Sequence, residues 1–110
     1  VEAAAGAAAP PAPGAIADVR ITDVRTWKLP QAILVEVVSD AGVSGWGECS
    51  PNNKDVVETF IRSALDAQVR GRSAWDAEPL WDDLFFEHHD LGPGGALTYA
   101  IAGIDMALWD

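Results

Sequence analysis

Residues 43–65, VSGWGECSPNNKDVVETFIRSAL, contain a change of hydrophobic period that decides the fold class. Before Pro51 the side chains alternate between two faces, which is the period of a β-strand. After Pro51 the apolar residues recur at the spacing of an amphipathic helix, namely Val57, Phe60, Ile61, Ala64 and Leu65. The stretch therefore predicts a strand followed directly by a helix, with Gly71 as the residue that ends the helix.

Two more strands are expected before this point. The alternation in segment 16–29 shifts near Thr22 and Asp23, which predicts a β-bulge, and Pro30 ends the strand because proline cannot donate to a ladder. The segment AILVEVVSDAG (32–42) begins with a run that is apolar apart from one glutamate, which is typical of a strand that lies centrally or is covered on both faces. Three sequential strands with short connections predict an antiparallel meander.

Two more helices are expected downstream. A short one begins with Asp76 as its cap and buries Leu80, Trp81, Leu84 and Phe85. The glycines and proline of EHHDLGPGG (87–95) predict a loop. The last helix begins near Ala96, with the small residues Ala100, Gly103 and Ala107 on one seam. The fold class is therefore α+β, a three-stranded antiparallel meander followed by about three helices.

The last helix is apolar on almost every side. Its large side chains are Leu97, Tyr99, Ile101, Ile104, Met106, Leu108 and Trp109. Burial of each such side chain contributes about 1.5–3 kcal/mol. Because a three-stranded sheet and two short helices are expected to cover only one side of it, the sequence predicts that a covering partner is missing.

Charge and composition limit the classes of function. The 110 residues fit one domain, and 17 acidic against 7 basic residues give a formal net charge of -10. Such a chain repels nucleic acid and anionic membranes, and no apolar run is long enough to span a bilayer. The single cysteine, Cys49, is interpreted as a core thiol.

The first residues differ in composition from the rest. Residues 1–15 are almost all Ala, Pro and Gly and are interpreted as a disordered leader, whereas 16–110 form the domain. The remnant of a cleaved export signal and a tether to an upstream segment are the alternatives for the leader. The lone thiol favours a cytoplasmic location, and a processed exported form stays an alternative.

Two motifs carry a resemblance to a known family. GVSGWGECSP (42–51) followed by AIAGIDMALWD (100–110) resembles the N-terminal capping domain of the enolase superfamily, in its mandelate racemase / muconate lactonizing enzyme branch. The resemblance covers residues 16–110, and the sugar-acid dehydratases of this branch, such as galactonate dehydratase, are the most similar around 92–110.

The resemblance implies a function for a longer protein. Enzymes of this family remove the proton alpha to a carboxylate with Mg²⁺ as cofactor, and the base and metal ligands belong to a (β/α)7β barrel that follows the capping domain. That barrel is absent from these residues, so the chain is expected to be truncated at its last helix, inactive alone, and without catalytic or metal-binding residues. The implied partners are the barrel, a small carboxylate substrate, and further copies in a homo-oligomer.

The same resemblance implies two substrate loops, at about 27–31 and 50–53. Their candidate residues are Trp27, Gln31, Pro51, Asn52 and Asn53. Among the reactions that the resemblance implies, dehydration is the first choice, and racemisation, epimerisation and cycloisomerisation are the alternatives. The residues also have plain structural interpretations, since the two asparagines are good helix caps and the tryptophan can pack beneath the first loop.

Three other polar features are interpreted as structural. His88 and His89 adjoin acidic residues, but adjacent side chains in a loop point apart, which favours solvated histidines over a metal site. Glu48 and Asp105 are interpreted as hydrogen-bonding groups that face the missing barrel. A second hypothesis for the whole chain is a free-standing, non-catalytic binding module that uses the apolar face of the last helix.

Overall fold

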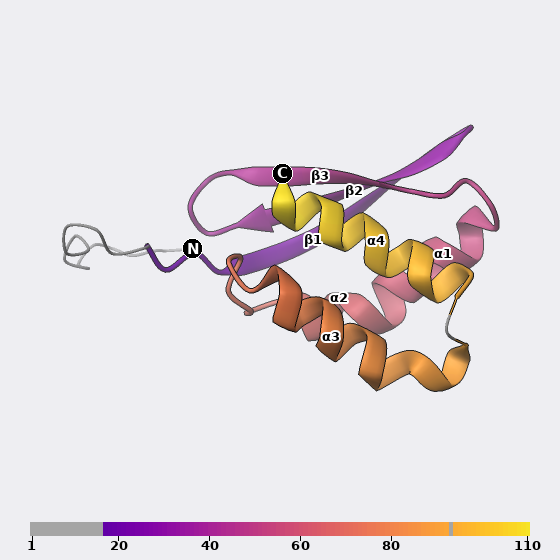
Figure 1. The fold of residues 1–110 in the computed structure, drawn as a ribbon. Coiled ribbons are helices and arrows are strands. Elements are labelled where there is room, and N and C mark those ends of the chain that lie inside the picture. Colours follow the sequence, from indigo (N-terminus) through magenta and orange to yellow (C-terminus); the bar gives the residue numbers. More distant parts are fainter. Residues whose placement is uncertain (1–16, 93) are drawn as a thin grey trace.

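A computed structural model describes residues 17–92 and 94–110, and the leader predicted at 1–15 lies outside them. The three strands are β1 (Ile21–Leu29), β2 (Ala32–Ser39) and β3 (Ser44–Cys49). They form one antiparallel sheet in the order β1-β2-β3 (Figure 1), so the predicted meander is confirmed.

Both irregularities predicted for the first strand are present. The register between β1 and β2 shifts between Ile21 and Asp23, which is the predicted bulge. β1 ends at Leu29, directly before Pro30. The strand is therefore regularly paired from the bulge to the turn that follows Leu29.

The helices follow the sheet in sequence. The first is continuous in three parts, α1 (Lys54–Phe60), a π-helical stretch η1 (Ile61–Leu65) and α2 (Asp66–Val69). The predicted stop is confirmed, because the left-handed φ of 84° at Gly71 suits glycine. Then come α3 (Ala77–His88), the short 3-10 helix η2 (His89–Leu91) and α4 (Ala96–Trp109). The loop predicted at 87–95 was placed too early, since helical structure continues to Leu91.

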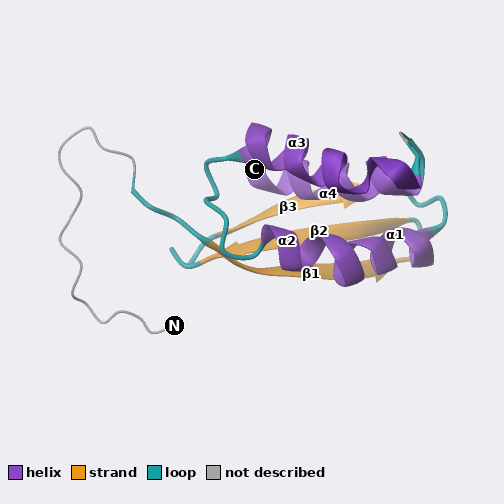
Figure 2. Ribbon diagram, turned by 90° about the horizontal axis from the view of Figure 1, so that it is seen from below, coloured by secondary structure: helices purple, strands orange, loops and turns teal. Residues whose placement is uncertain are grey.

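The helices cover one face of the sheet only (Figure 2). In β2, Ile33, Val35 and Val37 are buried beneath them, whereas the alternate residues Leu34 and Val38 are half-buried on the other face. β2 is the central strand of the sheet, which confirms one of the two predicted alternatives, whereas the described helices do not cover both of its faces. A continuous apolar run arises here because the helix-free face also carries apolar side chains.

The cover of α4 also differs from the prediction. α4 packs against β2 and β3 on one side and contacts α1 and α3 on others, so elements of this chain supply most of its cover. Leu97, Ile101 and Ile104 are fully buried, and only Met106 and Trp109 among its large side chains are exposed, by 47% and 67%. The small seam of Ala100, Gly103 and Ala107 is buried as predicted.

Candidate functional site

The sheet register brings two connections to the same end of the domain. Leu29 pairs with Ala32, so the chain turns at residues 30–31, and Ile33 pairs with Cys49, after which residues 50–53 lead into α1. The turn 30–31 and the loop 50–53 therefore leave the sheet side by side, on the right in Figure 1. The described C-terminal end lies away from them, because Asp110 Oδ2 accepts a hydrogen bond from Trp46 N at 3.0 Å.

The first of the two expected loops is shorter than predicted. Residues 27–29 belong to β1, so the connection consists of residues 30–31 alone. Trp27 is 48% exposed on the helix-free face, where its ring centroid lies 6.4 Å from that of Trp46. The strand extends because Trp27 has a ladder partner in Leu34. Gln31 is the exposed polar side chain of the turn itself.

Pro51, Asn52 and Asn53 are all exposed in the second connection. Asn53 occupies the N-cap position of α1 with a left-handed φ of 56°, but its side chain makes no capping hydrogen bond. The loop is instead held by Ser50, whose Oγ accepts from the backbone N–H of Asn52 at 3.2 Å. The prediction that an asparagine occupies the N-cap position is therefore confirmed for Asn53, but the hydrogen bond by which an asparagine side chain usually caps a helix is not made.

Three contacts join the end of β1 to the start of α1. Thr26 Oγ1 donates to Glu58 Oε2 at 2.8 Å, and the Lys28 ammonium pairs with Asp55. The hydrogen bond and charge of Asp55 raise the pKa of Lys28, and Lys28 in turn lowers the pKa of Asp55. The third contact is made by Lys54, whose Nζ donates to the backbone oxygens of residues 29 and 30 at 2.8 and 2.7 Å.

Sequence reasoning missed these contacts. A signal was nevertheless present, because Lys54 is the first residue of α1 and cations are unfavourable at the positive end of the helix dipole. A lysine in that position indicates a role other than support of its own helix. Beside it lies a hollow of about 430 Å³ lined by Lys28, Leu29, Pro30, Lys54 and Asp55.

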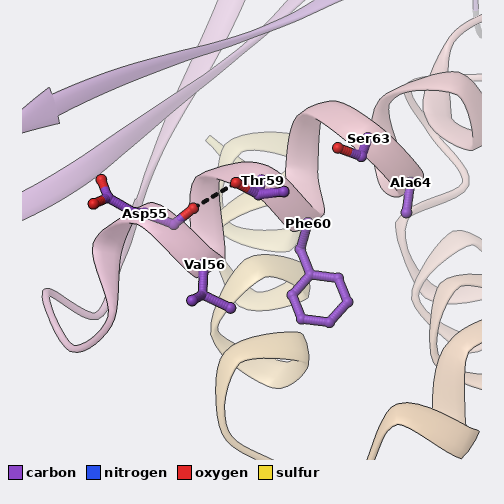
Figure 3. Close-up of a pocket in the computed structure, with 6 residues that line it drawn as sticks. All are labelled: Asp55, Val56, Thr59, Phe60, Ser63 and Ala64. Carbon is purple, nitrogen blue, oxygen red and sulfur yellow. Dashed lines mark hydrogen bonds between the residues drawn. The ribbon is translucent and has the colours of Figure 1, made fainter.

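A larger hollow lies on the outer side of the first helix (Figure 3). It measures about 460 Å³ and is lined by Asp55, Val56, Thr59, Phe60, Ser63 and Ala64. Its walls are mainly apolar, and the hydroxyl of Thr59 is engaged with the backbone oxygen of Asp55 at 2.7 Å. The one carboxylate in its lining, Asp55, is paired with Lys28, so the hollow offers mainly apolar contact area.

The two histidines, His88 and His89, each lie within hydrogen-bond distance of another group in the domain. His88 Nε2 lies 2.9 Å from Gln68 Oε1, and His89 Nδ1 lies 2.7 Å from the backbone oxygen of Phe86. His88 is half-buried at the end of α3, so the interpretation of both as solvated loop residues was wrong for it. Within residues 17–92 and 94–110, no group of three or more His, Cys, Asp or Glu side chains could hold a metal ion.

Cys49 is a buried free thiol, as predicted. Burial raises its pKa to about 11, so it is protonated and unreactive at neutral pH. Glu48 is exposed on β3 and Asp105 is half-buried on α4, and whether they face a further domain stays a prediction. None of the described helices is long and apolar enough to cross a membrane.

The described residues thus form an antiparallel meander with a helix layer on one face and two adjoining connections at one end. The family model for the mandelate racemase / muconate lactonizing enzyme N-terminal domain matches residues 14–110. The chain belongs to this family, and so to the enolase superfamily.

Proteins of known activity are similar to part of the chain. It is 36% identical over 93 residues to D-galactonate dehydratase of Ralstonia nicotianae, covering 83% of this chain and 24% of that protein. It is 35% identical over 81 residues to D-galactarolactone cycloisomerase of Agrobacterium fabrum, covering 71% of this chain and 20% of that protein. The chain thus spans less than a quarter of the length of these two relatives.

Solved structures have the same fold. A racemase from Streptomyces coelicolor with bound magnesium is 30% identical, with a TM-score of 0.74 over 81% of this chain and 29% of that one. A mandelate racemase/muconate lactonizing protein from Paracoccus denitrificans, complexed with magnesium, is 29% identical, with a TM-score of 0.70 over 84% of this chain and 25% of that one.

Proposed function

We propose that this chain is the capping domain of a Mg²⁺-dependent enzyme that abstracts the proton alpha to a carboxylate. The observation that carries the proposal is the pairing of Ile33 with Cys49, which sets the turn 30–31 and the loop 50–53 at one end of the sheet. Two exposed connections in that position can close together over the mouth of a barrel. Family membership and the dehydratase and cycloisomerase relatives support the same conclusion.

The domain contributes substrate contacts and exclusion of water. The side-chain amides of Gln31, Asn52 and Asn53 are exposed, and each can both donate to and accept from the hydroxyls or carboxylate of a substrate. Pro51 restricts the backbone of its loop, which lowers the entropy lost when the loop closes. Trp27 is the least favoured of the candidates, because its ring is engaged with Trp46.

The magnesium ligands are proposed to lie in a barrel that follows this domain. The described residues do not fit a metal, since they contain no suitable cluster of carboxylates, histidines or thiols. Two of the similar solved structures contain magnesium, which supports the cofactor for the enzyme as a whole. The base and the acid are likewise proposed to belong to that barrel.

Dehydration of a sugar acid is the reaction we favour. A base removes the proton on the carbon next to the carboxylate, and hydroxide leaves from the following carbon, protonated to water. The resulting enol becomes a 2-keto acid by proton transfer. The D-galactonate dehydratase relatives support this order of preference, while the cycloisomerase and the racemase support cycloisomerisation, racemisation or epimerisation as alternatives.

A contact surface for the barrel is proposed at the junction of α3 and α4. A hollow of about 390 Å³ is lined there by Glu78, Trp81, Asp82, Asp105 and Trp109. Trp81 and Trp109 are 36% and 67% exposed, and the side chain of Asp105 can make a hydrogen bond across the junction. The complete enzyme is proposed to be a cytoplasmic homo-oligomer.

The alternative of a free-standing binding module has less support. It requires an open apolar face on α4, yet Leu97, Ile101 and Ile104 are already buried within this chain. Only Met106 and Trp109 stay available for a partner, which is a small surface for specific binding.

A substrate screen tests the proposal. The longer gene product and the 110-residue chain are each incubated with Mg²⁺ and a panel of aldonic and aldaric acids in deuterium oxide. We expect the longer product alone to incorporate deuterium alpha to the carboxylate or to form a 2-keto acid, both detected by NMR. If a folded longer product does neither with any carboxylate, the proposed function is wrong.

A further inference from the structure

Lys54 links the two connections by hydrogen bonds between its side chain and the backbone. It is the first residue after the loop 50–53, and its Nζ lies 2.8 Å from the backbone oxygen of Leu29 and 2.7 Å from that of Pro30. A hydrogen bond in which the donor is charged is shorter and stronger than one between neutral groups. The start of the first helix therefore holds the turn 30–31 directly.

The neighbouring cation, Lys28, makes a different kind of contact. It pairs with the carboxylates of Asp55 and Glu58, at 2.5 and 3.8 Å. These carboxylates can move by rotation of their side chains, whereas the oxygens bound by Lys54 are fixed to the backbone of the turn. Among the described residues no carboxylate lies within ion-pair distance of Lys54. The hydrogen bonds of its ammonium therefore go to the backbone oxygens of residues 29 and 30.

We propose that Lys54 is a positioning residue that fixes the turn 30–31 relative to the loop 50–53, so that both meet one substrate in a single geometry. This inference rests on the proposed capping function. An ammonium suits the task because one nitrogen carries three donors and can meet two carbonyl oxygens at once. The side chain borders the hollow of about 430 Å³, and the two hydrogen bonds fix its ammonium end.

Backbone NMR of the 110-residue chain tests the link. Lys54→Met keeps most of the aliphatic stem and removes the donors, Lys54→Arg keeps donors, and Lys28→Met is the matched control. We expect Lys54→Met to lower the heteronuclear NOE of the Gln31 amide and to add exchange broadening at Gln31 and Asn52. Lys54→Arg should restore both signals, and Lys28→Met should leave them unchanged.

Two results would overturn the inference. One is a Lys54→Met variant whose Gln31 and Asn52 amide signals do not differ from those of the parent chain. The other is a loss of order at these amides in Lys28→Met that equals the loss in Lys54→Met. If Lys54→Met does not fold, the unmodified chain decides the question through scalar coupling across the hydrogen bonds from Lys54 Nζ to the carbonyl carbons of residues 29 and 30. Absence of that coupling in a resolved ammonium spectrum also overturns it.

The longer gene product separates this inference from the proposed function. There, Lys54→Met should raise KM for the sugar acid several-fold with a smaller change in kcat, and Lys54→Arg should restore KM. If the NMR effects occur but the product acts on no carboxylate, the proposed function fails while the positioning role stands. If the product is active and Lys54→Met changes neither the NMR signals nor KM, the positioning role fails while the capping function stands.

Discussion

Gly103 of α4 lies directly against Cys49 of β3. A Cβ added at Gly103 would overlap Sγ of Cys49 and would lie 3.0 Å from Cγ2 of Val35, and one added at Gly47 would overlap the backbone oxygen of Gly103. Helix and strand thus touch through their backbones, an approach that glycine allows. This contact sets the position of α4 over the sheet and explains how so short a chain covers its last helix.

Gly47→Ala should destabilise the domain strongly. The added methyl group meets a backbone oxygen, which cannot rotate away, so α4 must shift and lose packing. We expect a loss of about 3 kcal/mol in the free energy of unfolding, measured by urea denaturation. Gly94→Ala is the control, since no atom lies within 4 Å of its added Cβ, and similar losses for the two variants would contradict this account of the contact.

Stability should decline at alkaline pH because of Cys49. Burial raises the pKa of this thiol from 9.0 to about 11, so the unfolded chain ionises first. The stabilising contribution is complete below the unfolded pKa and is lost as pH rises through the folded one, a change on the order of 2–3 kcal/mol.

Urea denaturation of the parent chain and of Cys49→Ala, at about pH 8 and about pH 11, measures this loss, because other groups titrate in both proteins. The stability advantage of the parent should shrink with rising pH. A constant advantage would show that the thiol has no raised pKa.

Arg70 should stabilise the bulge of β1 in a pH-dependent way. Burial acts to raise the pKa of Asp23, but the hydrogen bond from Arg25 and the charge of Arg70 outweigh it and hold the pKa below the usual 3.8. The stabilisation is therefore present above that usual value and is lost as pH falls through the folded pKa. Arg70 also donates to the backbone oxygen of Thr22 at 2.9 Å.

Arg70→Met should accordingly cost about 1 kcal/mol at neutral pH and less at about pH 2.5, measured by urea denaturation. Arg62→Met is the control, because Arg62 lies in the helix that precedes Arg70 and forms no ion pair with another described residue. An Arg70 effect that does not depend on pH would contradict the assigned role of Asp23.

Asn53 should tolerate glycine better than alanine. Its φ of 56° is left-handed, a conformation that costs a residue with a Cβ roughly 1–2 kcal/mol unless it is asparagine or aspartate. Asn53→Ala should therefore lower the thermal unfolding midpoint, whereas Asn53→Gly should keep it close to that of the parent. A fall of the same size in both variants would point to a side-chain contact instead.

The alternation and helical periods in the sequence were sufficient to predict the meander, the bulge near Asp23 and the first helix. They succeeded because each depends on local spacing and on residues with a narrow conformational range, such as Pro30 and Gly71. The small seam of the last helix was predictable for the same reason. All of these features depend on residues that are close together in the sequence.

The cover of α4 could not be predicted in this way. It depends on how close a helix approaches a strand, which is decided by glycines at 47 and 103, far apart in the chain. The role of Lys54 was missed for a similar reason, because its acceptors are backbone oxygens 25 and 24 residues earlier in the sequence and carry no side-chain signature. The residues of the loop 50–53 were located correctly, but their substrate role stays a proposal.

The most direct test of the capping role is the effect of Gln31→Ala and Asn52→Ala on kcat/KM of the longer gene product with its best sugar acid. Val43→Ala, at the opposite end of the sheet, is the control. Loss of an amide that meets the substrate should lower kcat/KM by about tenfold or more, with the unfolding midpoint unchanged. If both loop variants keep the kcat/KM of the parent, these connections do not cap the substrate and the account is contradicted.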